Sequence, residues 1–361
     1  MAGVGGAASQ SVASVRWSPD GARLASASAD GTVRIWDAET QAEVLRLDGS
    51  SAGDLGAHSQ GISDVQWSFD GRLLCTCSDD KTLRLWDAAS GECLRVLRGH
   101  THFVMCCAFN RQGSVVASGA YDETVRLWEV KTGACVRKLP AHSDPVTAVD
   151  FSADSSLLVS SSHDGLCRIW DAETGSCMKT LLSPANPPIS FARFTPNSKY
   201  VLTASMGDDE CCLKLWNYES GKAEKVYRGH TNAKYCLLGS FFTHGGKSPL
   251  IVNGSEDGSI LFWDVTSQRV VQRISGGANG AGGAGDPADQ GPAEDEPPPA
   301  APEDGDGGDK AGPVAGDKAG PAEDAGHSNV VLTTACHPTK PWVASGELGD
   351  GATIKIWVRD L

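Results

Sequence analysis

The chain has 361 residues, of which 40% are hydrophobic, and its formal net charge is −14. No stretch approaches the roughly 18 consecutive apolar residues of a membrane-spanning helix, and residues 1–10 lack the charged and apolar regions of a secretory signal. We therefore expect an intracellular protein, nuclear or cytoplasmic or both, that does not bind membranes. The 12 cysteines lie mostly in apolar stretches, so reduced and mostly buried thiols are expected rather than a disulfide framework.

Most of the negative charge lies in one segment. Residues 276–325 contain 12 acidic residues and two lysines, and they are rich in Gly, Ala and Pro without any aromatic residue. Such a segment cannot offset the entropy of ordering itself, so we expect it to be disordered. It could serve as an acidic tether for basic partners such as histones, or it could be a tolerated surface loop. Since the rest of the chain is nearly balanced in charge, direct sequence-specific binding of nucleic acid is not expected.

Seven similar units follow one another along the chain. In the first unit, residues 14–17, 23–28 and 32–36 have strand character and are separated by turn signals at 18–21 and 30–31. Each unit ends in a tryptophan, and these are Trp36, Trp86, Trp128, Trp170, Trp216, Trp263 and Trp357. The intervals between them are 42 to 50 residues, except that the last interval also contains residues 276–325. This is the period of a four-stranded propeller blade.

Five of the units carry a histidine upstream and most carry a turn aspartate six residues before the tryptophan. The histidines are His58, His100, His142, His230 and His327. In the fifth and seventh units the aspartates, Asp209 and Asp350, stand seven residues before the tryptophan. We expect a hydrogen-bond relay from each histidine through a strand serine to the turn aspartate, near the indole. Because these residues recur from unit to unit, packing explains them better than catalysis does.

Motifs of enzymes and metal sites are absent or out of context. Residues 280–285 spell GxGxxG, but no helix pattern follows them, so no dinucleotide site is expected. Cys75 and Cys77 lack the CxxC and histidine spacings of zinc sites. No GxSxG, P-loop or HExxH motif occurs. We therefore expect no enzymatic activity, no cofactor and no metal.

The units resemble WD repeats. The Trp-Asp pairs that carry the resemblance are Trp36–Asp37, Trp86–Asp87, Trp170–Asp171 and Trp263–Asp264. The resemblance implies an all-β, seven-bladed propeller, with six blades in residues 11–275, the insert in 276–325 and the seventh blade in 326–361. The more specific segments 161–171, 186–191, 234–236 and 334–338 are similar to the propeller subunits of SET-domain histone methyltransferase complexes.

The same resemblance implies that the ring closes imperfectly. In the family, a strand upstream of the first repeat completes the last blade, whereas the ten residues before Ser11 have the Gly- and Ala-rich composition of coil, so we expect none of them to supply that strand. The last unit ends at residues 357–361 without an outer strand of its own. We expect either an incompletely closed last blade with an exposed strand edge or a truncated start.

One end of a propeller channel is ringed by residues near the start of each innermost strand and by the residue before each turn aspartate. By counting along the repeats, we place Ala13, Ser63, Met105, Thr147, Ser190 and Leu332 in the first set, with Tyr235 and Cys236 in the sixth unit. The second set is Ala29, Asp79, Tyr121, His163 and Glu256. A ring with two tyrosines and two carboxylates suits a cationic peptide side chain.

The family resemblance implies that this channel takes an arginine side chain from a partner. Thr147 and Cys236 would offer main-chain carbonyls and Asp79 would meet a peptide amine. Supporting side chains would come from Ser63, Tyr121, Tyr235 and Leu348. The two positions that stack on the guanidinium are phenylalanines in the family but Met105 and Leu238 here, which forgoes a cation–π term of about 0.5–2 kcal/mol per ring. His163 replaces a family tyrosine and would repel an arginine once it is protonated, at an ordinary pKa of about 6.5.

The resemblance also implies a second groove, on the opposite side, that receives a short hydrophobic and acidic motif from a companion subunit. Its residues are Asn197, Tyr200, Leu215, Phe241 and Gln272. These match the family's residue types, whereas Thr243 replaces a valine. The groove is therefore better preserved than the arginine pocket, as in a paralogue that keeps its complex while changing or losing its peptide ligand.

Our first hypothesis is a non-catalytic adaptor, monomeric within a larger complex, that holds a SET-domain methyltransferase and a companion subunit together and presents a histone tail. The alternative is a scaffold of another complex, such as a ubiquitin-ligase substrate receptor or an RNA-processing particle, with a different peptide ligand. An enzyme is a distant third.

Overall fold

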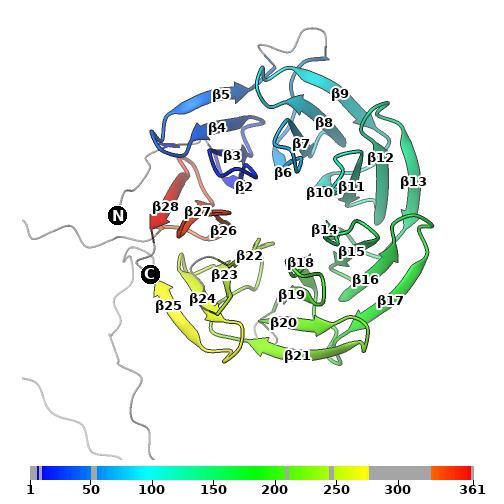
Figure 1. The fold of residues 1–361 in the computed structure, drawn as a ribbon, viewed down its shortest axis with the longest axis vertical. Coiled ribbons are helices and arrows are strands. Elements are labelled where there is room, and N and C mark those ends of the chain that lie inside the picture. The colour runs from blue at the N-terminus through cyan, green and yellow to red at the C-terminus, as the bar shows by residue number, and fades with distance from the viewer. Residues whose placement is uncertain are drawn as a thin grey trace, which may run out of the picture.

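The computed structural model describes residues 6–7, 10–49, 55–207, 211–243, 248–275 and 327–358. These residues form 28 β-strands in seven four-stranded antiparallel sheets. Figure 1 shows the sheets arranged as blades around a central axis. No helix that could cross a membrane is found among the described residues. The prediction of an all-β, seven-bladed propeller is confirmed.

Blades 1 to 6 each consist of four consecutive strands, ordered from the channel to the rim (Figure 1). Blade 1 contains β2 (Val12–Trp17), β3 (Arg23–Ser28), β4 (Val33–Asp37) and β5 (Glu43–Leu47), and blade 2 contains β6 (Ile62–Trp67), β7 (Leu73–Ser78), β8 (Thr82–Asp87) and β9 (Cys93–Arg98). Blade 3 contains β10 (Val104–Phe109), β11 (Val115–Ala120), β12 (Thr124–Glu129) and β13 (Cys135–Pro140), and blade 4 contains β14 (Val146–Phe151), β15 (Leu157–Ser162), β16 (Leu166–Asp171) and β17 (Cys177–Leu182). Blade 5 contains β18 (Ile189–Phe194), β19 (Val201–Ser205), β20 (Cys212–Asn217) and β21 (Lys222–Tyr227), and blade 6 contains β22 (Ser240–Phe242), β23 (Leu250–Gly254), β24 (Ile260–Asp264) and β25 (Val270–Ile274).

Blade 7 draws its strands from both parts of the chain. It contains β26 (Val331–Cys336), β27 (Trp342–Glu347) and β28 (Thr353–Val358), and its fourth strand is the N-terminal β1 (Gly6–Ala7). Gly6 pairs with Ile354 and Ala7 with Thr353. Only two residues form this strand, which confirms the predicted imperfect closure.

The expectation that no residue before Ser11 supplies the closing strand is wrong. Every non-proline residue carries a backbone donor and acceptor, so two small residues can pair with β28 without any side-chain pattern. The segment 276–325, predicted to be disordered, lies outside the described residues, as does Asp209.

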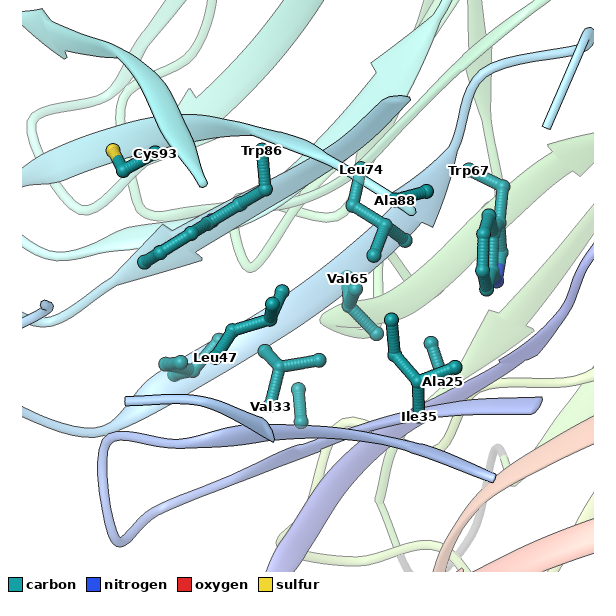
Figure 2. Packing of buried hydrophobic residues seen from close by; sticks show 12 residues of the cluster. Ala25, Val33, Ile35, Leu47, Val65, Trp67, Leu74, Trp86, Ala88 and Cys93 are labelled. Carbon is teal, nitrogen blue, oxygen red and sulfur yellow. The ribbon is translucent and has the colours of Figure 1, made fainter. Parts of the chain in front are cut away.

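Apolar side chains between neighbouring sheets hold the blades together. Figure 2 shows the cluster between blades 1 and 2, where Ile35 and Leu47 meet Val65, Leu74 and Trp86. The seam between blades 7 and 1 has a similar cluster, which includes the buried residues Val12, Trp36, Ile354 and Ile356. The ring is therefore closed mainly by side-chain packing rather than by the short β1–β28 ladder.

The predicted relay residues meet in blades 2, 3 and 4, but the histidine rather than the strand hydroxyl lies in the middle, and in blade 2 that hydroxyl belongs to Thr76 instead of a serine. In blade 3, Nδ1 of His100 lies 3.0 Å from the Asp122 carboxylate, and Nε2 lies 2.7 Å from Ser118 Oγ. The same hydroxyl accepts a hydrogen bond from the Trp128 indole at 2.8 Å. His58 and His142 make equivalent contacts in blades 2 and 4.

Blades 6 and 7 depart from the predicted relay. In blade 7 the carboxylate beside His327 is Glu347, at 3.1 Å from Nδ1, and not Asp350, because the last turn has a different length. Glu347 also accepts hydrogen bonds from the N–H and the hydroxyl of Thr353. In blade 6 both ring nitrogens of His230 are buried and have no hydrogen-bond partner among the described residues. There Asn253 replaces the relay serine, and Asp257 pairs with Arg273 instead.

Candidate functional site

Six inner strands share one irregularity near their first residue. In β2, β6, β10, β14, β18 and β26 the pairing register shifts and leaves one residue outside the ladder. These residues are Ala13, Ser63, Met105, Thr147, Ser190 and Leu332. A β-bulge of this kind bends the strand and redirects a side chain. They are the six residues that the repeat count placed at the channel.

The sixth blade builds its part of the ring differently. Its inner strand β22 has only three residues, and Leu238 just before it forms a parallel bridge with Thr333 of blade 7. The Leu238 N–H donates to the Leu332 carbonyl at 2.8 Å, and the Thr334 N–H donates to the Leu238 carbonyl at 3.0 Å. Leu238 is thus fixed to the neighbouring blade.

A cavity of about 220 Å³ lies at this end of the channel. Among its lining residues are Ala13, Ser63, Asp79, Met105, Thr147, Cys236, Leu238 and Leu332. Six of the ten residues predicted for peptide binding therefore meet in one hollow. Gly61 and Ile62 also line it and were not predicted, because only the bulge brings this part of β6 to the channel.

The other four predicted residues do not line the cavity. Nε2 of His163 lies 3.7 Å from the Cys236 sulfur. The main-chain N–H of Tyr235 donates to Glu256 Oε1 at 2.9 Å, and that of Leu348 donates to the Val330 carbonyl at 2.9 Å.

Tyr121 belongs to an exposed aromatic cluster. Its ring is stacked on that of His102 with the centroids 5.4 Å apart, and it meets Phe103 edge-on at 5.8 Å. Tyr121 and Phe103 are 39% and 36% exposed. The sequence reasoning missed His102 and Phe103, although their place just before Met105 could have indicated them.

Asp79 is the charged group in the wall of the cavity. Burial raises the pKa of its carboxyl, the Ser63 hydrogen bond opposes the rise, and the neighbouring Asp80 carboxylate adds to it. Ser63 Oγ donates to Asp79 Oδ1 at 3.3 Å. Among the described residues no lysine, arginine or histidine forms an ion pair with Asp79. A partly desolvated carboxylate without a counter-ion attracts a cation.

Cys236 lines the cavity, and His163 lies behind it, in contact with its sulfur. Burial lowers the pKa of His163 and Asp144 partly opposes this, so repulsion of an arginine begins at a lower pH than the ordinary histidine value that the sequence suggested. Burial raises the pKa of Cys236 to about 12. A thiol with so high a pKa beside a neutral imidazole is not an activated nucleophile, so the pair offers packing rather than catalysis.

The residues predicted for the second groove lie on blades 5 and 6. Tyr200, Leu215 and Phe241 share one apolar cluster. Asn197 Oδ1 accepts hydrogen bonds from Thr195 Oγ1 and the Lys199 N–H within its own turn. Gln272 stands opposite Phe262 in the outer pair of blade 6. The structure thus brings the three apolar members together.

Comparison with known proteins places this geometry in a family. The sequence matches the WDR5 beta-propeller domain over residues 6–282 and the WD domain, G-beta repeat, over residues 323–358. THO complex subunit 6 of Homo sapiens is 35% identical over 88 residues, 24% of either chain. THO complex subunit 6 of Arabidopsis thaliana is 32% identical over 93 residues, which are 26% of this chain and 23% of that protein. The probable coatomer subunit beta' of Schizosaccharomyces pombe is 30% identical over 86 residues, 23% of this chain and 10% of that protein.

The chain spans a quarter or less of the length of these curated relatives. The first family match, in contrast, covers well over half of the chain. The protein therefore belongs to the WD-repeat propellers of the WDR5 beta-propeller type, a family of protein-interaction scaffolds that are generally non-catalytic.

Proposed function

We propose that this propeller is a non-catalytic adaptor that binds a cationic peptide side chain, above all arginine, at the Asp79 end of its channel. The observation that carries the proposal is the partly buried Asp79 carboxylate, which has no described ionic partner and lines the cavity of about 220 Å³. A cavity of this size lies below the range of about 300–1,000 Å³ typical of drug-sized ligands. It suits one peptide side chain better than a small-molecule substrate.

The walls of the cavity fit the aliphatic part of an arginine side chain and the flat faces of its guanidinium. Met105 and Leu238 line opposite segments of the ring and are apolar without an aromatic face. None of the described groups donates a hydrogen bond to the Cys236 carbonyl, which therefore stays available to a ligand donor. The proposed binding set is Ser63, Asp79, Met105, Tyr121, Thr147, His163, Tyr235, Cys236, Leu238 and Leu348.

We propose further that the peptide comes from a histone methyltransferase complex, as a SET-domain enzyme, a companion subunit or a histone tail. The match to the WDR5 beta-propeller domain supports this assignment. In it, the groove of Asn197, Tyr200, Leu215, Phe241 and Gln272 would hold the companion subunit. The protein would act as a monomer within the complex, in the nucleus or the cytoplasm.

A scaffold of another complex is the second candidate. Two of the curated relatives are named as subunits of the THO complex and one as a probable subunit of coatomer, which favours assembly with other partners. The RNA-processing particle among our alternatives is one such scaffold of another complex. The ring would then bind a different peptide.

Calorimetric titration with an arginine-containing peptide that follows the sequence of a SET-enzyme linker tests the first proposal. We expect binding that weakens about tenfold in Asp79→Asn, which keeps the shape of the side chain but removes its charge. Unchanged affinity in Asp79→Asn would contradict the proposed site. Binding of the peptide without co-purification of a methyltransferase from cells would support the arginine-binding pocket but favour the second candidate for the complex.

A further inference from the structure

The opposite end of the channel holds a larger cavity, of about 460 Å³. Each inner strand runs from one mouth to the other, so Ala13 and Thr147 line the first cavity, and Arg16 and Asp150 on the same strands line the second. At about 3.3 Å per residue, the three residue steps from one position to the other correspond to roughly 10 Å of channel. The two cavities are therefore separate sites at opposite mouths.

Aromatic rings form the wall of the second cavity. Trp17, Phe109, Phe151 and Phe194 are the last residues of β2, β10, β14 and β18, and all four line it. Each of these rings is at most 9% exposed, so packing against its neighbours holds it in place. A wall of this kind accepts an apolar or aromatic side chain from a ligand.

The acidic groups near this wall already have hydrogen-bond partners. Asp150 Oδ2 accepts from the Phe194 N–H at 2.9 Å. Asp64, deeper in the channel, accepts from Ser14 Oγ at 2.7 Å and from the Val65 N–H at 2.9 Å. It also lies 3.7 Å from the Arg16 guanidinium.

The arginines near this wall, in contrast, have N–H groups that no described group accepts. Among the described residues, Nε of Arg16 is buried without a hydrogen-bond partner. The guanidinium of Arg193 lies 5.6 Å from the centroid of the Phe191 ring, and no described group accepts a hydrogen bond from it. Burial and the nearby Arg193 charge lower the pKa of Arg16 to about 10, and Asp64 and Asp150 partly oppose this. Both arginines therefore have N–H donors that no described group accepts.

A third arginine stands at the entrance. The guanidinium of Arg111 lies 4.7 Å from the centroid of Phe69, a ring that is 55% exposed beside the channel mouth. None of the described carboxylates pairs with Arg111. The entrance thus joins an exposed apolar ring to a cation that has no ionic partner.

We propose that this mouth binds an acidic peptide segment of a partner protein, with a carboxylate on Arg193 and Arg111 and an adjacent apolar side chain against the aromatic wall. The site goes beyond the proposed function because it lies at the other mouth and takes the opposite charge. It is also distinct from the second groove, of which only Phe241 lines the cavity. A phosphate-rich ligand fits less well, since the Asp150 carboxylate in the wall repels a dianion more strongly than a single carboxylate.

The test uses N-acetyl-Phe-Glu-amide as the probe and N-acetyl-Phe-Gln-amide as its neutral match. Binding is followed by NMR through the indole N–H of Trp17, which lines the cavity and is assigned with Trp17→Phe. We expect millimolar binding of the Glu probe, at least about fivefold weaker binding of the Gln probe, and a loss of at least about fivefold in Arg193→Gln. Arg72→Gln removes an exposed arginine that does not line this cavity and is expected to leave the affinity unchanged.

Three results would overturn this proposal: equal affinity for the Glu and Gln probes, no binding up to about 20 mM, or full affinity in Arg193→Gln. Tighter binding of inorganic phosphate or of a short oligonucleotide would overturn it in favour of a phosphate ligand. The thermal midpoint of each variant shows that the fold is intact. This test does not use the arginine peptide of the proposed function, so a negative result at one mouth of the channel does not contradict the proposal for the other.

Discussion

The hydroxyl of Ser63 donates a hydrogen bond to the Asp79 carboxylate at 3.3 Å, and this bond joins the two sets of residues that surround the channel. Ser63 is the bulge residue of inner strand β6, and Asp79 is the residue before the next turn aspartate. The bond holds the carboxylate at the cavity wall while burial raises its pKa. In the proposed site, the position and protonation of this one carboxyl therefore govern the binding of a cation.

We predict that binding of an arginine peptide weakens with acid sooner than an ordinary aspartate would allow. Because the pKa of Asp79 is raised above its usual value, its charge is lost at a higher pH than the ordinary value of about 3.9. Titration calorimetry between about pH 7 and pH 4 is expected to show this loss, and Asp79→Asn is expected to show a nearly flat profile. An equally steep profile in Asp79→Asn would assign the effect to another group. His163→Gln tests the histidine, whose lowered pKa places any repulsion at lower pH.

Aromatic walls should strengthen arginine binding. Met105→Phe together with Leu238→Phe supplies two faces for a guanidinium, each worth about 0.5–2 kcal/mol, so the affinity is expected to rise about fivefold or more. The control is Val136→Phe, which adds a ring on an outer strand where the side chain is 56% exposed. Extra volume in a packed wall costs about 1–3 kcal/mol of stability, and thermal melting separates that cost from binding. Weaker binding by a folded double variant would show that this channel does not take arginine.

The ring residues could be predicted because the repeat dictates them. Each inner strand ends in an aromatic residue or a cysteine, and counting four residues back from it reached six residues that prove to lie at β-bulges. Irregular contacts could not be counted in this way. Glu347 replaces Asp350 because the last turn has a different length, and Gly6–Ala7 pairs through backbone groups that leave no side-chain pattern.

The cavity at the opposite end of the channel was missed for a different reason. Arg16 and Arg193 stand far apart in the sequence, and each looks like an ordinary charge next to an aromatic strand end. Their proximity, and the absence of a described hydrogen-bond acceptor for Arg193, follow only from the closure of the ring. A balance of hydrogen-bond donors and acceptors depends on the three-dimensional arrangement, whereas a repeat count does not.

Two histidines in equivalent places are expected to respond oppositely to mutation. His100→Leu leaves the buried Asp122 and Ser118 without their partner, and an unsatisfied buried polar group costs about 1–3 kcal/mol. His230→Leu removes a ring whose two nitrogens already lack hydrogen bonds, so a neutral or stabilising effect is expected. Urea unfolding of both variants measures the difference. Equal losses would mean that the His230 nitrogens are satisfied in solution, for example by water.

The relays should make the fold sensitive to acid. Burial opposes ionisation of Asp122 and Glu347, but hydrogen bonds from their histidine and threonine neighbours prevail, which lowers the pKa of Asp122 and brings that of Glu347 to about 2. Stability from such carboxylates is present above their unfolded pKa values of about 4 and is lost as the pH falls towards the folded ones. Burial lowers the pKa of His100, so the unfolded chain binds its proton first and stability already declines below about pH 6.5.

Thermal midpoints measured from about pH 7 to pH 3 check the acid prediction. We expect a continuous decline, and a shallower one in His100→Gln, which cannot be protonated. A flat profile above about pH 5 would show that the buried histidines do not contribute.

The seam between blades 7 and 1 allows a direct comparison of backbone pairing with apolar packing. Ile354 is 2% exposed in the cluster of that seam, and truncation of such a side chain to alanine costs about 2–5 kcal/mol, so Ile354→Ala is expected to lower the unfolding free energy by that amount. Removal of residues 1–7 deletes the two-residue strand β1 and leaves the cluster in place, so a smaller loss of about 1–3 kcal/mol is expected. It also uncovers the edge of β28, and an unpaired edge recruits other chains. Light scattering should therefore detect self-association of the shortened protein but not of Ile354→Ala, and a larger loss of stability from the deletion than from the truncation would mean that the backbone ladder, and not the apolar seam, closes the ring.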